Sequence, residues 1–96
     1  MQQFTIDQIK QKAIPILKNA GITKSAIFGS YVRGDAKETS DIDFLIAFPE
    51  NTTLLDVVRL QRALEARLQK KVDLVSYNAI SPLIKDSILK YQYQLL

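Results

Sequence analysis

The sequence predicts a single α/β (α+β) domain, 1–96, built as a small mixed three-stranded sheet flanked by helices. Its 96 residues suffice for one domain. A strand, a helix and a strand at residues 41–48, 54–70 and 72–76 form a β-α-β unit, whose two strands should be parallel with a right-handed crossover. The link from an earlier strand at 25–28 is too short for a crossover helix, which favours an antiparallel pair there.

The first element is a helix over residues 5–20, where apolar residues recur at three- and four-residue steps. Thr5 is its expected N-cap and Gly21 its C-terminal stop. Because Pro15 removes one internal hydrogen bond, we expect a kink or a restarted helix near residues 11–15.

A short apolar strand at residues 25–28 follows, and it ends at Gly29-Ser30. Residues 31–33 predict a helical turn, which the dipeptide Gly34-Asp35 closes. A polar loop over residues 36–40 leads to the strongest strand pattern, 41–48, whose apolar run indicates burial on both faces.

The second long helix, residues 54–70, has Thr53 and Asp56 in the pattern of a capping box. Its expected buried stripe consists of Leu54, Val57, Leu60, Leu64 and Leu68. After strand 72–76, Ser81-Pro82 should open a last helix that reaches about Tyr91.

The chain ends in an unusually apolar tail, residues 88–96. We expect Ile88 and Leu89 to pack in the core. For the four other apolar residues the sequence leaves core packing and contact with a partner equally open. These residues are Tyr91, Tyr93, Leu95 and Leu96.

The composition excludes several kinds of chemistry. With no His and no Cys, the chain cannot use Ser-His or Cys-His catalysis or an ordinary zinc site. A bound metal must have oxygen ligands, which favours Mg²⁺, Mn²⁺ or Ca²⁺, and a general base must be a carboxylate, Lys or Tyr. The net charge of +3 is more typical of solvated helix faces than of a nucleic-acid surface. The lack of Cys, of a signal peptide and of a long apolar stretch suits a cytoplasmic protein without membrane contact.

The most informative motif is Gly29-Ser30 followed, after ten residues, by Asp41-Ile42-Asp43. Asp41 and Asp43 should share one face of their strand, and Asp73 lies on the strand expected beside it. Two such charges ~4 Å apart repel by ~4 kcal/mol at an effective dielectric of 20, and a cation removes that cost. The motif therefore predicts a divalent-metal site, although Asp-Ile-Asp by itself is more typical of exposed acids in a loop. Without a metal, one of the three carboxyl groups should have a raised pKa.

The same motif predicts binding of phosphate. Gly29 allows the backbone to approach a phosphate closely, and Ser30 adds a hydroxyl at the start of a helical turn with free N–H groups. Two Mg²⁺ ions would suit phosphoryl or nucleotidyl transfer.

Three neighbours of the motif have alternative interpretations. Arg33 or Lys37 could reach a triphosphate tail, or be solvated or paired with the nearby acids at positions 35 and 38. Tyr31 could stack on a base, but a packing role is favoured.

The stretches Phe28 to Gly34 and Ser40 to Ile46 closely resemble the signature of the DNA polymerase β-like nucleotidyltransferase superfamily. The chain is most similar to the stand-alone minimal nucleotidyltransferases (MNT), over nearly its whole length. The resemblance implies the polymerase β-like fold. It also implies that Gly29 and Ser30 bind phosphate, that Asp41 and Asp43 hold both metals, and that Asp73 completes the triad and acts as base.

Many proteins of this group resemble antitoxins paired with a helical HEPN ribonuclease toxin, and some transfer AMP from ATP to a tyrosine hydroxyl of the toxin. The resemblance thus implies a Mg²⁺-dependent nucleotidyltransferase that modifies a hydroxyl of a HEPN toxin. Because the accessory helical domain of larger relatives is missing, a partner or a second copy should supply the remaining surface. Two alternatives stay open: a non-catalytic antitoxin that binds its partner, and a nucleotidyltransferase acting on RNA or a small molecule. The modest charge argues weakly against long nucleic acids.

Overall fold

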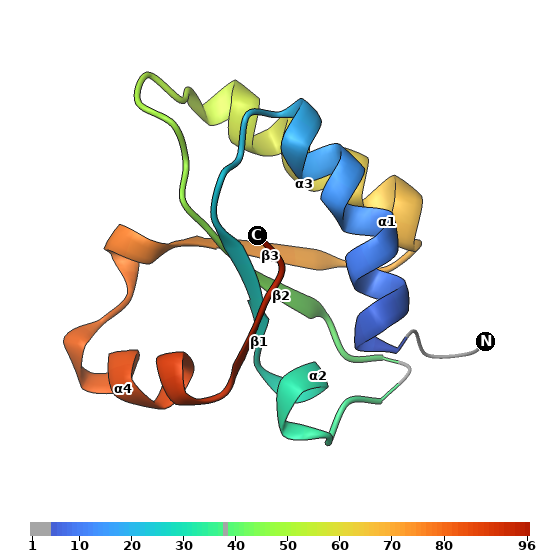
Figure 1. The fold of residues 1–96 in the computed structure, drawn as a ribbon, viewed down its shortest axis with the longest axis vertical. Coiled ribbons are helices and arrows are strands. Elements are labelled where there is room, and N and C mark those ends of the chain that lie inside the picture. Colours follow the sequence, from blue (N-terminus) through green and yellow to red (C-terminus); the bar gives the residue numbers. More distant parts are fainter. Residues whose placement is uncertain (1–4, 38) are drawn as a thin grey trace.

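The protein forms one mixed four-stranded sheet with helices on both of its faces (Figure 1). This computed structural model describes residues 5–37 and 39–96. The strand order is β3-β2-β1-β4, with the bounds β1 (Ser25–Phe28), β2 (Ile42–Ile46), β3 (Val72–Ser76) and β4 (Gln92–Gln94). β2 is parallel to β3 and antiparallel to β1, as the connection lengths predicted.

The predicted number of three strands is wrong, because the chain end adds β4 antiparallel to β1. The backbone N–H groups of Leu95 and Leu96 donate to the carbonyl of Ser25, at 2.8 and 3.1 Å. Leu95 is buried, and Tyr93 and Leu96 pack against the core. The apolar tail is therefore mostly part of this protein's own fold, whereas Tyr91 is 47% exposed.

Helix α1 (Ile6–Asn19) begins at Thr5, which forms a capping box with Gln8. The helix runs through Pro15 as a single element, so of the two alternatives predicted near this residue, a kink or a restarted helix, the restart is wrong. Pro15 has no N–H to donate to the carbonyl of Gln11, four residues earlier. Both residues are exposed, so water can donate a hydrogen bond to that carbonyl instead.

Helix α3 (Leu54–Leu68) begins with the predicted capping box of Thr53 and Asp56. Leu60, Leu64 and Leu68 are buried, as expected from their spacing. Leu54 is 80% exposed, which contradicts its assignment to the buried stripe. The reason is its place in the first turn, which extends beyond the strands that α3 covers (Figure 1).

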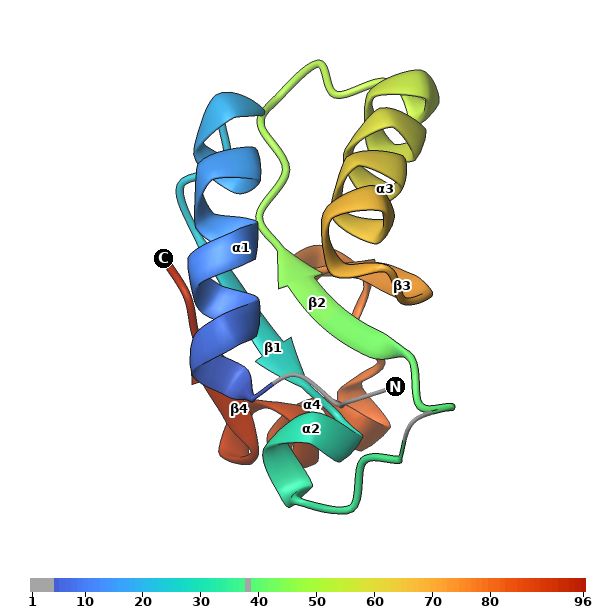
Figure 2. The same ribbon diagram turned by 90° about the vertical axis from the view of Figure 1, so that its right-hand side faces the viewer.

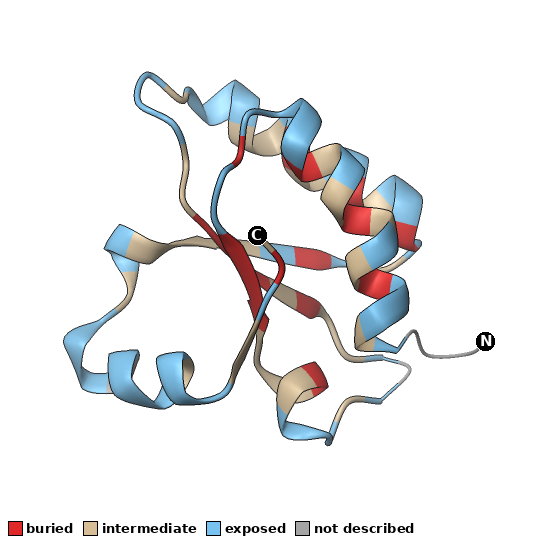
Figure 3. Cartoon of the chain, in the orientation of Figure 1, coloured by how far each residue is buried: buried red, intermediate tan, exposed pale blue. Residues whose placement is uncertain are grey.

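The main core lies between the sheet and the pair α1 and α3, which lie side by side on one face (Figures 1 and 2). Helix α4 (Pro82–Lys90) lies on the other face and is largely exposed (Figure 3). Leu89 is 36% exposed there, so its predicted place in the core is wrong. Two short helices, α2 (Ser30–Arg33) and η1 (Tyr77–Ala79), complete the fold. None of the described helices is long and apolar enough to span a bilayer.

Candidate active site

The centre of the site is a row of residues across three strands. Asp43 of β2 pairs with Phe28 of β1 on one side and with Asp73 of β3 on the other. Residues that are paired across neighbouring strands project to the same face of a sheet. The predicted meeting of Asp43 and Asp73 is therefore found, on the face away from the core between the sheet and α1 and α3.

Gly29 lies directly against the carboxylate of Asp43. A Cβ atom placed on Gly29 would overlap Asp43 Oδ2. The backbone of Gly29 also has φ +81° and ψ −148°, a conformation that only glycine adopts readily. Both the space and the backbone at this turn therefore require glycine, which explains why the strand β1 ends here.

Helix α2 starts next to this carboxylate, with Gly29 as its N-cap. The N–H groups of Val32 and Arg33 donate to the Gly29 carbonyl, at 3.1 and 3.0 Å. The N–H groups of Ser30 and Tyr31 precede them in the first turn, where a helix offers no internal acceptor. The first turn of α2, which carries Ser30, thus begins at the residue that packs against Asp43.

The electrostatics of the row follow from burial and like charge. Burial, then the negative charges of Asp73 and Asp41, raise the pKa of Asp43 from its ordinary 3.8 to about 6. A carboxyl–carboxyl contact with Asp73 acts in the same direction, while the positive charge of Arg33 acts against it. The expectation of one raised carboxyl pKa in the absence of a cation is confirmed.

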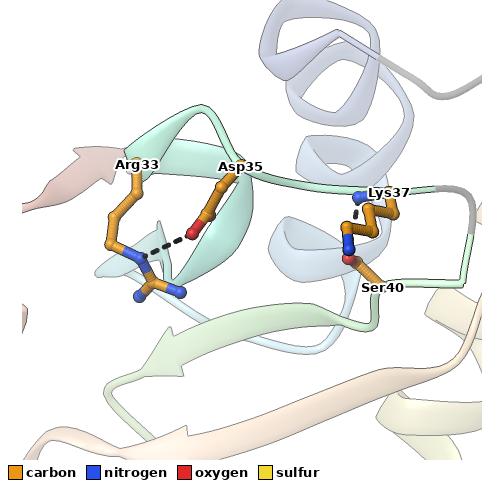
Figure 4. Close-up of polar contacts among 4 residues, drawn as sticks. All are labelled: Arg33, Asp35, Lys37 and Ser40. Carbon is orange, nitrogen blue, oxygen red and sulfur yellow. Dashed lines mark hydrogen bonds and ion pairs between the residues drawn. The ribbon is translucent and has the colours of Figure 1, made fainter.

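Asp41 lies just before β2, close enough for its charge to act on Asp43. A closed turn leads into it: the Lys37 N–H donates to Ser40 Oγ at 2.8 Å, and the Ser40 N–H donates to the Lys37 carbonyl at 2.9 Å (Figure 4). The composition of residues 36–40 by itself predicts only a polar loop. Ser40 lies three residues after Lys37, and a serine at this spacing in a polar loop is a signal for a side chain that binds the backbone of a turn.

The alternatives for the neighbouring side chains are partly decided. Arg33 forms an ion pair with Asp35, with Nε and Oδ2 3.6 Å apart and both side chains exposed (Figure 4). Tyr31 is buried in the core cluster, so packing, rather than stacking on a base, is its role in this structure. The suggested partner of Lys37 at position 38 lies outside the described residues.

The donor set suits a hard divalent cation. Every candidate ligand is a carboxylate oxygen, and burial together with the negative charges of Asp73 and Asp41 raises the pKa of Asp43 although the positive charge of Arg33 acts against it. Within residues 5–37 and 39–96, no three acidic side chains are already assembled as a metal site. The structure thus brings Asp43 and Asp73 together and places Asp41 nearby, and these residues fit Mg²⁺ or Mn²⁺.

Comparison with known proteins agrees with this geometry. The profile of the family described as "Polymerase beta, Nucleotidyltransferase" matches residues 11–96. The chain is 54% identical over 86 residues to "Putative protein adenylyltransferase MJ0435" of Methanocaldococcus jannaschii, which covers 90% of this chain and 92% of that protein.

Two solved structures have the same fold over most of the chain. One, described as "Structure of putative minimal nucleotidyltransferase", has a TM-score of 0.78 and 36% identity, and covers 92% of this chain and 90% of its own. The other, "Crystal structure of the toxin-antitoxin with AMP-PNP", has a TM-score of 0.77 and 25% identity, and covers 91% of this chain and 72% of its own.

Proposed function

Because the chain belongs to the polymerase β nucleotidyltransferase family, we propose that it transfers AMP from ATP, with Mg²⁺, to a hydroxyl of a partner protein. The partner in this proposal is a HEPN toxin, for which the chain is the antitoxin. The observation that carries the proposal is the row of Asp43 and Asp73 with Gly29 packed against it.

The polar groups beside this row suit a triphosphate. The free N–H groups of Ser30 and Tyr31 and the Ser30 hydroxyl would donate to phosphate oxygens. Gly29 presents no side chain, so the nucleotide can approach the backbone closely. Arg33 adds a positive charge that already acts on Asp43.

Asp43 and Asp73, with Asp41 beside them, would hold the metal. When bound, Mg²⁺ would neutralise phosphate charge and lower the pKa of the attacking hydroxyl. Asp73 is exposed and lies beside Asp43, which suits it to accept the proton of the acceptor hydroxyl.

The choice of ATP and of a protein acceptor rests on the relatives. One has the name "Putative protein adenylyltransferase MJ0435", and another is described as "Crystal structure of the toxin-antitoxin with AMP-PNP", an ATP analogue. The HEPN partner rests on the resemblance of residues 28–34 and 40–46 to the MNT signature.

The test is the intact mass of a HEPN protein that is co-expressed with this chain. We expect mass increments of AMP with the native chain and none with Asp41→Asn or Asp43→Asn, both folded by circular dichroism. Asp86→Asn, an exposed acid on α4, is the matched control and should label normally.

Other outcomes select the other functions. Neutralisation of the toxin by Asp41→Asn without ATP would identify a contact-only antitoxin. Labelling of RNA or a metabolite by radioactive ATP without any partner would replace the protein acceptor. Full labelling of the partner by both Asn variants would refute the proposed site.

A further inference from the structure

The outer edge of β3 is held by two side chains of a helix. Among the described strands, β3 has a neighbour, β2, on one side only and is therefore an edge strand. The Ile42 N–H donates to the Lys71 carbonyl at 3.0 Å, and Ile42 is in register with Val72. In a parallel ladder this directs the backbone groups of residues 71 and 73 toward β2, and those of Val72 away from it.

Both outward groups of Val72 are bound by α3. Gln61 Nε2 donates to the Val72 carbonyl at 2.9 Å, and the Val72 N–H donates to Glu65 Oε2 at 3.1 Å. Gln61 and Glu65 are four residues apart and therefore lie on one face of the helix. Together they give Val72 the pair of hydrogen bonds that a neighbouring strand would provide. We call these two side chains the edge clamp.

The edge clamp acts on a residue that cannot use water instead. Val72 is completely buried, and an unpaired buried backbone group costs about 1–3 kcal/mol. Loss of either bond would therefore favour movement of the start of β3 toward a place where its polar groups meet water. That segment leads directly into Asp73.

Asp73 is under an opposing force. It is in register with Asp43, and the charges of the two carboxylates repel each other. Since no strand of the described residues lies outside β3, the repulsion between the two carboxylates is opposed by the ladder with β2 and by the edge clamp.

We propose that Gln61 and Glu65 are positioning residues for Asp73. Through Val72 they hold the start of β3 at the separation from β2 at which Asp43 and Asp73 bind one divalent cation. This inference rests on the proposed nucleotidyl transfer, in which both carboxylates hold the metal.

Three substitutions test the clamp through its hydrogen bonds. Gln61→Met and Glu65→Met keep the length of the side chain but remove the polar group. Glu65→Gln removes the charge but keeps an acceptor for the Val72 N–H. Arg62→Met, on an exposed position of the same helix, is the matched control.

The readouts are amide hydrogen exchange at Val72 and Asp73, affinity for Mn²⁺ alone by calorimetry, and kcat for AMP transfer at saturating ATP and Mg²⁺. We expect both Met variants to exchange faster and to lose about 10–100-fold in Mn²⁺ affinity and in kcat. Glu65→Gln and Arg62→Met should stay within about twofold of the native protein in both quantities.

A folded Met variant with faster exchange at Val72 but native Mn²⁺ affinity and kcat would overturn the proposal, leaving a purely structural contact. Loss of Mn²⁺ affinity in Glu65→Gln equal to that in Glu65→Met would also overturn it, because the charge and not the hydrogen bond would then matter. If one Met variant does not fold, the other decides. If the native protein labels no partner, the proposed function is refuted. If the Met variants then still bind Mn²⁺ more weakly than the native protein, the edge clamp is supported independently.

Discussion

Replacement of Gly29 by alanine should damage both the stability and the site, and Gly34→Ala provides a matched control. Both glycines flank α2 and have positive φ, +81° and +87°. A Cβ on Gly34 would meet nothing within 4 Å, whereas a Cβ on Gly29 would overlap Asp43 Oδ2. The two variants therefore separate the cost of backbone strain from the cost of the steric clash.

The magnitudes follow from these environments. Gly34→Ala should cost about 1–2 kcal/mol, the price of a left-handed backbone for an L-residue. Gly29→Ala should lower the free energy of unfolding by about 1–3 kcal/mol through backbone strain and by a further 1–3 kcal/mol, roughly, through overpacking against Asp43. For a domain of this size, each kcal/mol lowers Tm by roughly 4–8 °C. The drop for Gly29→Ala should thus be about two to three times that for Gly34→Ala.

The assay combines thermal unfolding by circular dichroism with AMP transfer and Mn²⁺ affinity, both measured well below Tm. Gly29→Ala should lose Mn²⁺ affinity and transfer because Asp43 must turn away, while Gly34→Ala should keep both. In the double variant Gly29→Ala/Asp43→Ala the steric part of the loss should disappear, so the two changes should not be additive. Equal Tm drops for the two glycine variants, together with native transfer by Gly29→Ala, would refute the close contact between Gly29 and Asp43.

Three further predictions concern stability. The pKa of Asp43 is raised to about 6, so ionisation of this carboxyl group destabilises the folded protein. The destabilisation is absent below pH about 4 and reaches its full size above pH about 6. Asp43→Asn should therefore stabilise the metal-free protein in urea by about 1 kcal/mol at pH 8, after allowance for solvent screening, and should have no such effect near pH 3.5; equal gains at both values would contradict this. Hydrogen bonds from Thr53 lower the pKa of Asp56, so Asp56→Ala should reduce Tm at pH 7, with a difference that shrinks as the pH falls through that lowered value and with transfer unchanged. Ser25→Ala removes the bond from Ser25 Oγ to the Leu45 carbonyl (2.8 Å) and should cost about 1 kcal/mol in urea unfolding, while a change in kcat would show that this strand also acts on the site.

Local features of the fold were predictable because they depend on residues close in sequence. The capping box of Thr53 and Asp56 is an example, since both bonds lie within one helical turn. The directions of β1, β2 and β3 followed from the lengths of their connections. Leu54 was misplaced because helical periodicity tells which side of a helix a residue is on, but not where the sheet beneath it ends.

Features that depend on distant segments could not be predicted. Nothing in residues 92–94 alone shows that they pair with β1, because a strand this short depends on its neighbour for its hydrogen bonds. The edge clamp was missed for a related reason. Gln61 and Glu65 are ordinary polar helix residues until the return of β3 places the buried backbone of Val72 beside them.

By itself, the sequence determined the chemical inventory of this protein: carboxylates without His or Cys, two of them two residues apart where a strand begins, and a glycine and a serine at an earlier turn. These are properties of composition and of local backbone geometry. Only the tertiary structure decided that Asp73 lies in register with Asp43, that Gly29 packs against that carboxylate, and that α3 holds the strand carrying Asp73. Register and close packing are set by hydrogen bonds and contacts between segments far apart in the chain, and no spacing within one segment encodes them.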